Sequence, residues 1–139
     1  MSPQEKLLRV IQERQLVSFS NNTRWKNFTA SKILKLPLQF RIKWIFRDTA
    51  ASWGRLFSPV DGYLEQGDLG PIPFREIEWL EIDPIQRKSR GILLTNLEID
   101  HSKDIGGILT ECQQTFLKRD KIYRVFGYRE AGVSSQKGE

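Results

Sequence analysis

Residues 38–46 read Leu-Gln-Phe-Arg-Ile-Lys-Trp-Ile-Phe, and this stretch decides the fold. Large apolar side chains recur at every second position from Leu38 to Phe46, with Arg41 and Lys43 between them. A period of two is the pattern of a β-strand with one buried face. Each large apolar side chain contributes about 1.5–3 kcal/mol when fully buried, so this strand can anchor a core. We expect Arg41, Lys43 and Arg47 to form a basic row on the opposite side, facing solvent or a partner.

Helical patterns lie on both sides of this strand. Residues 2–5 read Ser-Pro-Gln-Glu, a capping box that predicts a helix start. A second helix is expected to begin with Asn22 or Thr23 as its cap and to run to about residue 35. Ser102 is expected to cap a third helix. The apolar stripe of that third helix is formed by Ile105, Ile108, Leu109 and Cys112.

Further strands complete the predicted sheet. We expect strands at residues 77–82 and 122–128, and a hairpin turn at Asp61-Gly62. Residues 86–90, Gln-Arg-Lys-Ser-Arg, are interpreted as a charged turn that precedes the apolar run 92–94. This order predicts one α+β domain over residues 1–129: a mainly antiparallel sheet of about four to five strands, with two N-terminal helices and one C-terminal helix packed on it. Residues 130–139 are expected to form a flexible tail.

The composition favours a folded domain of the cytoplasm. The 139 residues carry a net charge of +5, include one Cys, and contain no apolar run near the roughly 20 residues that a membrane-spanning helix needs. No leader for secretion is recognised, so we expect a cytoplasmic protein without an internal disulfide. Residues 1–50 carry ten basic against three acidic residues, and residues 51–100 carry five against nine. This division is typical of solvated faces, and it also suits steering toward a protein partner with charges of both signs.

The sequence offers little catalytic equipment. His101 has no nucleophile motif beside it, and Cys112 falls on an apolar helical stripe, so both are interpreted as structural residues. Glu78 and Glu81 are expected on opposite faces of their strand, with one carboxylate half-buried. An ion pair with Arg75, Arg41 or Arg124 is the plainer interpretation of that carboxylate, and a general base is the sharper one. We predict no enzyme activity, no metal and no cofactor; a hydrolase built on Glu78 and His101 is kept as a third hypothesis.

Four segments carry a resemblance to a known family. They are residues 21–25 (Asn-Asn-Thr-Arg-Trp), 77–82 (Ile-Glu-Trp-Leu-Glu-Ile), 99–102 (Ile-Asp-His-Ser) and 123–128 (Tyr-Arg-Val-Phe-Gly-Tyr). In this order they resemble an uncharacterised family of small bacterial proteins that look like immunity proteins of polymorphic antibacterial toxin systems. The resemblance implies a protein that protects the producing cell by binding a cognate toxin domain. It transfers no catalytic residues and does not locate the binding surface.

Two binding surfaces are therefore considered. The leading hypothesis is that the protein blocks the active site or substrate surface of the toxin, with a protein-modifying toxin such as an ADP-ribosyltransferase favoured over a nuclease. Anchors of the Trp, Tyr and Arg types with charged neighbours dominate tight interfaces. On that ground the expected partner-binding residues are Trp53, Arg55, Asp61, Tyr63, Glu65, Asp68, Arg75 and Glu76. The alternative is a small nucleic-acid-binding protein that contacts phosphates through Arg24, Lys26, Arg41, Lys43 and Arg47.

Overall fold

A four-stranded antiparallel sheet forms the centre of the protein. The structure is a computed structural model, and it describes residues 1–56, 60–66 and 69–131. The strands of the central sheet lie in the order β2 (Gln39–Trp44), β5 (Ile77–Asp83), β9 (Ile122–Phe126) and β8 (Phe116–Arg119). The predicted strand at residues 38–46 therefore occupies the edge of the sheet, beside the central strand β5.

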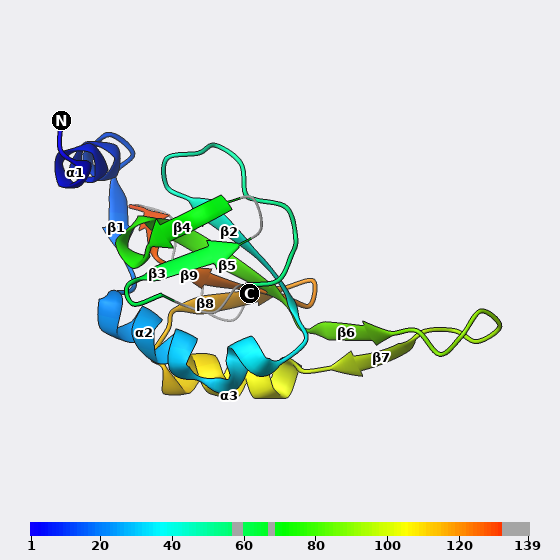
Figure 1. Ribbon diagram of the computed structural model, residues 1–139. Coiled ribbons are helices and arrows are strands. Elements are labelled where there is room, and N and C mark those ends of the chain that lie inside the picture. The colour runs from blue at the N-terminus through cyan, green and yellow to red at the C-terminus, as the bar shows by residue number, and fades with distance from the viewer. Residues whose placement is uncertain (57–59, 67–68, 132–139) are drawn as a thin grey trace.

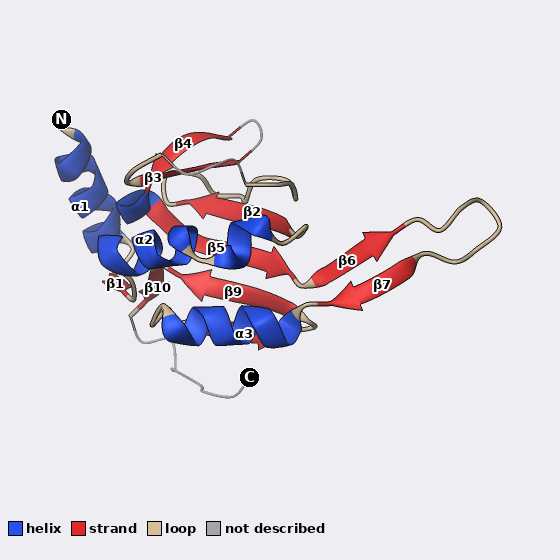
Figure 2. Ribbon diagram, turned by 60° about the horizontal axis from the view of Figure 1, so that its bottom comes forward, coloured by secondary structure: helices blue, strands red, loops and turns tan. Residues whose placement is uncertain are grey.

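Helices cover one face of this sheet. Figure 2 shows α2 (Asn22–Ala30) and α3 (Ser102–Glu111) lying across it, with the short 3-10 helix η1 (Lys32–Lys35) after α2. Alternate strand residues such as Ile42, Leu80 and Val125 point toward these helices and are fully buried. The helices contribute large side chains to the same core, among them Trp25, Phe28, Ile33, Ile105 and Leu109. The α+β class and the antiparallel sheet are thus confirmed.

Three two-stranded sheets surround the central one in the described part of the chain. Strand β3 (Tyr63–Gln66) pairs with β4 (Leu69–Pro73) and closes over the core through Leu64 and Ile72. Strand β1 (Leu16–Ser18) pairs with β10 (Tyr128–Glu130), next to α1 (Pro3–Glu13). Strand β6 (Ile85–Lys88) pairs with β7 (Leu97–Asp100) in a hairpin that projects from the body of the molecule (Figure 1). The described residues hold more strands than the four or five predicted.

Local capping chemistry sets the starts of α1 and α2, whereas the predicted cap of α3 was wrong: Ser102 is the first residue of that helix, and the His101 side chain before it makes no capping bond. The Ser2 hydroxyl accepts a hydrogen bond from the Glu5 backbone N–H at 3.1 Å, as predicted for α1. The predicted cap of α2 was wrong by one residue, because the Asn21 side chain accepts from the Arg24 N–H at 2.8 Å. The α-helical part also ends earlier than predicted, at Ala30, and the chain then re-enters a 3-10 turn capped by Ser31. A serine hydroxyl that accepts from the N–H two residues later favours such a restart.

Two other expectations need correction or placement. Residues 86–90 are not simply a turn, because Gln86, Arg87 and Lys88 belong to β6 and pair with Ile99, Glu98 and Leu97. The turn at Asp61-Gly62 is confirmed by the bridge between Val60 and Tyr63, and Gly62 supplies the positive φ of 83°. Residues 132–139 of the predicted tail lie outside the described residues. None of the helices within the described ranges has the length and apolar character needed to cross a membrane.

Candidate functional site: a cleft of arginines, carboxylates and aromatic rings

The face of the sheet turned away from α2 and α3 carries a cleft of about 480 Å³. Its floor comes from β5 and β9, where Trp79 pairs with Phe126 and Glu81 pairs with Arg124. Its walls are completed by strands β8 and β10 and by Arg14, the residue that caps the end of α1. We call this the arginine cleft; its lining residues are Arg14, Arg41, Glu78, Trp79, Glu81, Leu117, Arg119, Asp120, Ile122, Arg124, Phe126, Tyr128, Arg129 and Glu130.

Glu81 lies between two arginines of neighbouring strands. The register places Arg41 of β2 and Arg124 of β9 directly opposite it. The Arg41 Nε donates to one carboxylate oxygen at 2.6 Å, and the Arg124 Nε donates to the other at 2.9 Å. Because the Glu81 side chain is only 8% exposed, these two charge-assisted bonds compensate for most of its lost hydration. The predicted ion pairs with Arg41 and Arg124 are therefore confirmed.

A β-bulge brings the second carboxylate to the same side. Lys43 pairs with Trp79 and Trp44 pairs with Ile77, so Glu78 is the extra residue between these two pairs. The strict alternation of a strand would have placed Glu78 and Glu81 on opposite faces, and that prediction was wrong. The bulge is held by the Gly127 N–H, which donates to the Glu78 carbonyl oxygen at 2.8 Å.

Glu78 is fixed as an anion by two cations. Arg14 donates from both terminal nitrogens to the two carboxylate oxygens at 2.7 and 3.0 Å, and the Lys43 Nζ donates at 2.8 Å. Burial alone would raise the pKa of Glu78, but the hydrogen bonds from Arg14 and Lys43 outweigh it and the pKa is lowered. A carboxylate with a lowered pKa is a weak proton acceptor, so this geometry suits ion pairing better than general-base chemistry.

Three arginines lie over aromatic rings around the cleft. The Arg124 Cζ is 4.0 Å from the centroid of the Trp79 ring, and the Arg129 Cζ is 4.4 Å from that of Phe126. At the outer side of β2, the Arg41 Cζ is 4.7 Å from the centroid of Trp53. Stacking restrains a guanidinium while leaving N–H groups on its edges for a ligand. The cleft therefore offers preorganised donors beside fixed carboxylates.

The residues predicted for partner binding are spread over several places. Trp53 is exposed and adjoins the arginine cleft through its contact with Arg41. Asp61 lines a separate groove of about 180 Å³ beside Lys26 and Thr29 of α2. Arg55, Tyr63 and Arg75 are exposed and Glu65 is half-buried, whereas Asp68 lies outside the described residues.

Glu76 occupies a structural position. It is buried, and its carboxylate accepts from the Trp44 Nε1 at 3.0 Å. The basic row expected on β2 is also wrong at Lys43, whose side chain is 9% exposed and bound to Glu78. The bulge explains this outcome, because it moves Glu78 within reach of the Lys43 ammonium group.

The isolated His and Cys are placed away from the cleft. The His101 Nε2 lies 2.9 Å from the Gln86 side-chain oxygen at the base of the β6–β7 hairpin. Cys112 is buried at the end of α3, and burial raises the pKa of its thiol. Within the described ranges, no group of three or more His, Cys, Asp or Glu side chains is arranged to hold a metal ion.

Sequence reasoning missed several residues of the cleft. Arg14, Tyr128 and Arg129 were not singled out, because Arg14 caps the end of α1 and the other two lie in β10, a strand of three residues that is too short to show a periodic face. A signal was present within β9: Arg124 and Phe126 alternate with the core residues Tyr123 and Val125, which marks an outward face with mixed character.

Comparison with known proteins places the chain in a family. No curated protein and no solved structure matches it. The expectation of an uncharacterised family is confirmed, because a family model covers residues 7–132 and so spans all the strands described above. The chain belongs to the Family of unknown function (DUF6678).

Proposed function

We propose that the protein is an immunity protein, which binds a cognate antibacterial toxin domain in the cytoplasm of a bacterial cell and blocks its active site or substrate surface. The observation that carries the proposal is the arginine cleft, with Trp53 stacked beside it. Residues of the Trp, Tyr and Arg types are enriched at the energetic centres of protein interfaces, and Trp79, Tyr128, Arg124 and Arg129 lie together here. The resemblance of residues 21–25, 77–82, 99–102 and 123–128 to immunity proteins supports the same role.

The charge pattern of the cleft favours a partner with both signs. Glu78 and Glu81 are each held by two cations, so their charges are oriented rather than mobile. Because these side chains are already held in place, little free energy is spent on ordering them when a partner binds. Fixed charges also select against partners whose own charges are arranged differently. A protein-modifying toxin, such as an ADP-ribosyltransferase, is favoured over a nuclease, because a net charge of +5 suits poorly an inhibitor that must replace a nucleic acid.

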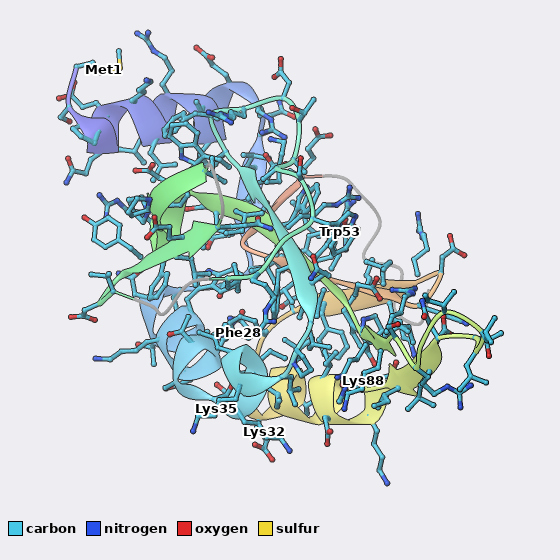
Figure 3. The ribbon with its side chains drawn as sticks, turned by 45° about the vertical axis from the view of Figure 1, so that its right-hand side comes forward. Met1, Phe28, Lys32, Lys35, Trp53 and Lys88 are labelled. Atoms are coloured by element: carbon cyan, nitrogen blue, oxygen red, sulfur yellow. The ribbon has the colours of Figure 1, made fainter. Side chains whose placement is uncertain are left out.

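The test is co-purification with the toxin encoded beside the gene, together with survival of cells that express this toxin. The variant Trp53→Ala/Arg129→Ala removes two stacked side chains and leaves both buried carboxylates paired; it is expected to lose binding and protection. The matched control is Lys32→Ala/Lys35→Ala, on η1 and well apart from Trp53 (Figure 3). A second comparison, Asp61→Ala/Tyr63→Ala, tests the other predicted residues. Failure of the wild-type protein both to bind and to protect would refute the proposal, and loss only with the Asp61 and Tyr63 variant would move the interface away from the cleft.

Nucleic-acid binding is the weaker candidate. Of the five cations predicted to contact phosphates, Lys43 and Arg41 are already bound to Glu78 and Glu81. Binding through them would require these buried pairs to open, which adds a cost that exposed cations do not carry. The check is retention of RNA or DNA at increasing salt, since phosphate contacts weaken steeply as salt rises.

A further inference from the structure

The β6–β7 hairpin ends in an apolar tip that the fold does not use. In Figures 1 and 2 the hairpin extends away from the sheet and helices. The exposed fractions of Ile92, Leu93 and Leu94 at its end are 102%, 96% and 59%. Three consecutive large aliphatic residues in water contribute nothing to the core. Exposed apolar patches of this kind mark surfaces that meet another apolar phase.

The tip has a defined shape. The Arg90 Nε donates to the Thr95 carbonyl oxygen at 3.0 Å, and its Nη2 donates to the Thr95 hydroxyl at 3.2 Å. Gly91 takes a positive φ of 114°, which turns the chain before the three aliphatic residues. Arg90 thus closes the loop across its base and satisfies a carbonyl group that would otherwise need water. The aliphatic side chains are presented together by a closed loop.

The charge of the hairpin is of one sign toward the tip. Residues 84–97 include Arg87, Lys88 and Arg90 and no acidic residue. Arg87 lies nearer the base and pairs with Asp83 at 3.3 Å and with Glu98 at 3.5 Å. Lys88, labelled in Figure 3, and Arg90 are therefore the cations that flank the apolar tip. Long basic side chains beside inserted apolar groups can reach the headgroup level of a membrane, where anionic lipids attract them.

We propose that the tip of the β6–β7 hairpin inserts reversibly into the surface of membranes that contain anionic lipids. A lipid surface accepts exposed aliphatic side chains without a pocket shaped for each of them, whereas a protein partner must supply such pockets. The tip also lacks the aromatic anchors that mark protein interfaces, since residues 84–97 contain no Trp, Tyr or Phe. This inference is independent of toxin binding, which is assigned to the arginine cleft on the body of the molecule.

The experiment is sedimentation of the full chain with vesicles. The wild-type protein is expected to bind vesicles of phosphatidylcholine and phosphatidylglycerol, to bind pure phosphatidylcholine vesicles more weakly, and to be released as salt rises. The variant Ile92→Asp/Leu93→Asp is expected to lower the partition coefficient on the anionic vesicles by at least about tenfold, because it removes the inserted groups and adds repelled charges. Lys88→Gln/Arg90→Gln is expected to remove the preference for anionic vesicles.

Matched controls separate insertion from general attraction. Val60→Asp changes an exposed aliphatic residue on the body of the protein and is expected to leave vesicle binding unchanged. Lys32→Gln/Lys35→Gln removes two cations of η1, outside the hairpin, and tests whether overall charge is responsible. Absence of wild-type binding to the anionic vesicles, or equal binding by the Ile92→Asp/Leu93→Asp variant, overturns the proposal. Loss of toxin protection by this variant without any vesicle binding would assign the tip to a protein contact instead.

Discussion

Arg14 and Glu78 are 64 positions apart in the chain, yet the Arg14 guanidinium donates two hydrogen bonds to the Glu78 carboxylate. This pair ties the end of α1 to the central strand β5. Lys43 of β2 donates to the same carboxylate, so three elements meet at one buried charge. Stability should therefore depend on the ionisation of Glu78.

The loss of unfolding free energy at acidic pH is expected to reflect the protonation of Glu78. Because its folded pKa is lowered, its contribution is fully present above 4.5, the ordinary glutamate pKa, and is lost as the pH falls through the folded pKa. Glu78→Gln should lower the free energy of unfolding at pH 7 by about 1–3 kcal/mol, since Lys43 then lacks its counter-ion. The same variant should lose less stability on acidification than the wild type. Urea unfolding at several pH values is the measurement, and Glu13→Gln, on the exposed side of α1, is the matched control for loss of charge.

Gly127 is expected to tolerate no side chain. A Cβ atom there would overlap the Ile77 carbonyl oxygen at the β5 bulge. Gly127→Ala should therefore lower the unfolding free energy by at least about 2 kcal/mol or prevent folding. Gly107→Ala is the opposite control, because nothing lies near its Cβ position in α3, and it should raise stability by about 0.5–1 kcal/mol. Equal melting temperatures for the wild type and Gly127→Ala would contradict this view of the bulge.

Gln66 is expected to hold the outer edge of β2. Its side-chain oxygen accepts from the Ile42 N–H at 2.9 Å, and its Nε2 donates to the carbonyl oxygens of Ser52, at 3.0 Å, and Phe40. Gln66→Leu preserves the volume and leaves the buried Ile42 N–H unsatisfied, which should cost about 2–3 kcal/mol. Gln39→Leu, at an exposed position of β2, should change stability by less than about 0.5 kcal/mol. Thermal or urea unfolding of both variants is the measurement, and equal losses of stability for Gln66→Leu and Gln39→Leu would contradict this role of Gln66.

Arg41 and Arg124 are expected to act as alternatives for Glu81. Either Arg41→Ala or Arg124→Ala leaves one cation on the carboxylate, whereas the double variant leaves none. The double variant should therefore lose more stability than the sum of the single losses, by about 0.5–3 kcal/mol. Additive losses would show that the two arginines stabilise the sheet independently. The pair Arg41→Ala and Arg87→Ala, in which Arg87 lies on the hairpin, provides the additive reference.

Local patterns were enough to predict most of the fold. The capping box at residues 2–5 and the stripe of Ile105, Ile108 and Leu109 are decided within one turn of helix, so the sequence alone identifies α1 and α3. The alternation of Leu38, Phe40 and Ile42 likewise identifies β2, the strand that packs against α2 and α3. The α+β class follows from these elements. The number of strands in the protein was underestimated, in part because β6 carries polar residues and packs on no core.

The candidate site was harder to predict because one backbone irregularity creates it. The regular alternation of a strand would place the side chains of Glu78 and Glu81 on opposite faces of β5. Only the bulge opposite Lys43 and Trp44 brings both side chains to the same face. Nothing in the local sequence marks that bulge, and Gly127, which packs closely on it and donates to the Glu78 carbonyl oxygen, comes about fifty residues later in the chain. Arg14 joins the cleft for a similar reason, through a contact that no local pattern encodes. The partner-binding residues predicted around Trp53 remain a prediction.

The pairing of β1 with β10 sets an order for biosynthesis. Leu16 emerges from the ribosome long before its strand partner Glu130. The nascent chain must therefore keep this edge open until β10 has been made, which extends the time during which chaperones can act on it. A circular permutant that joins the two strands through a short linker would turn this slow, distant closure into a local hairpin.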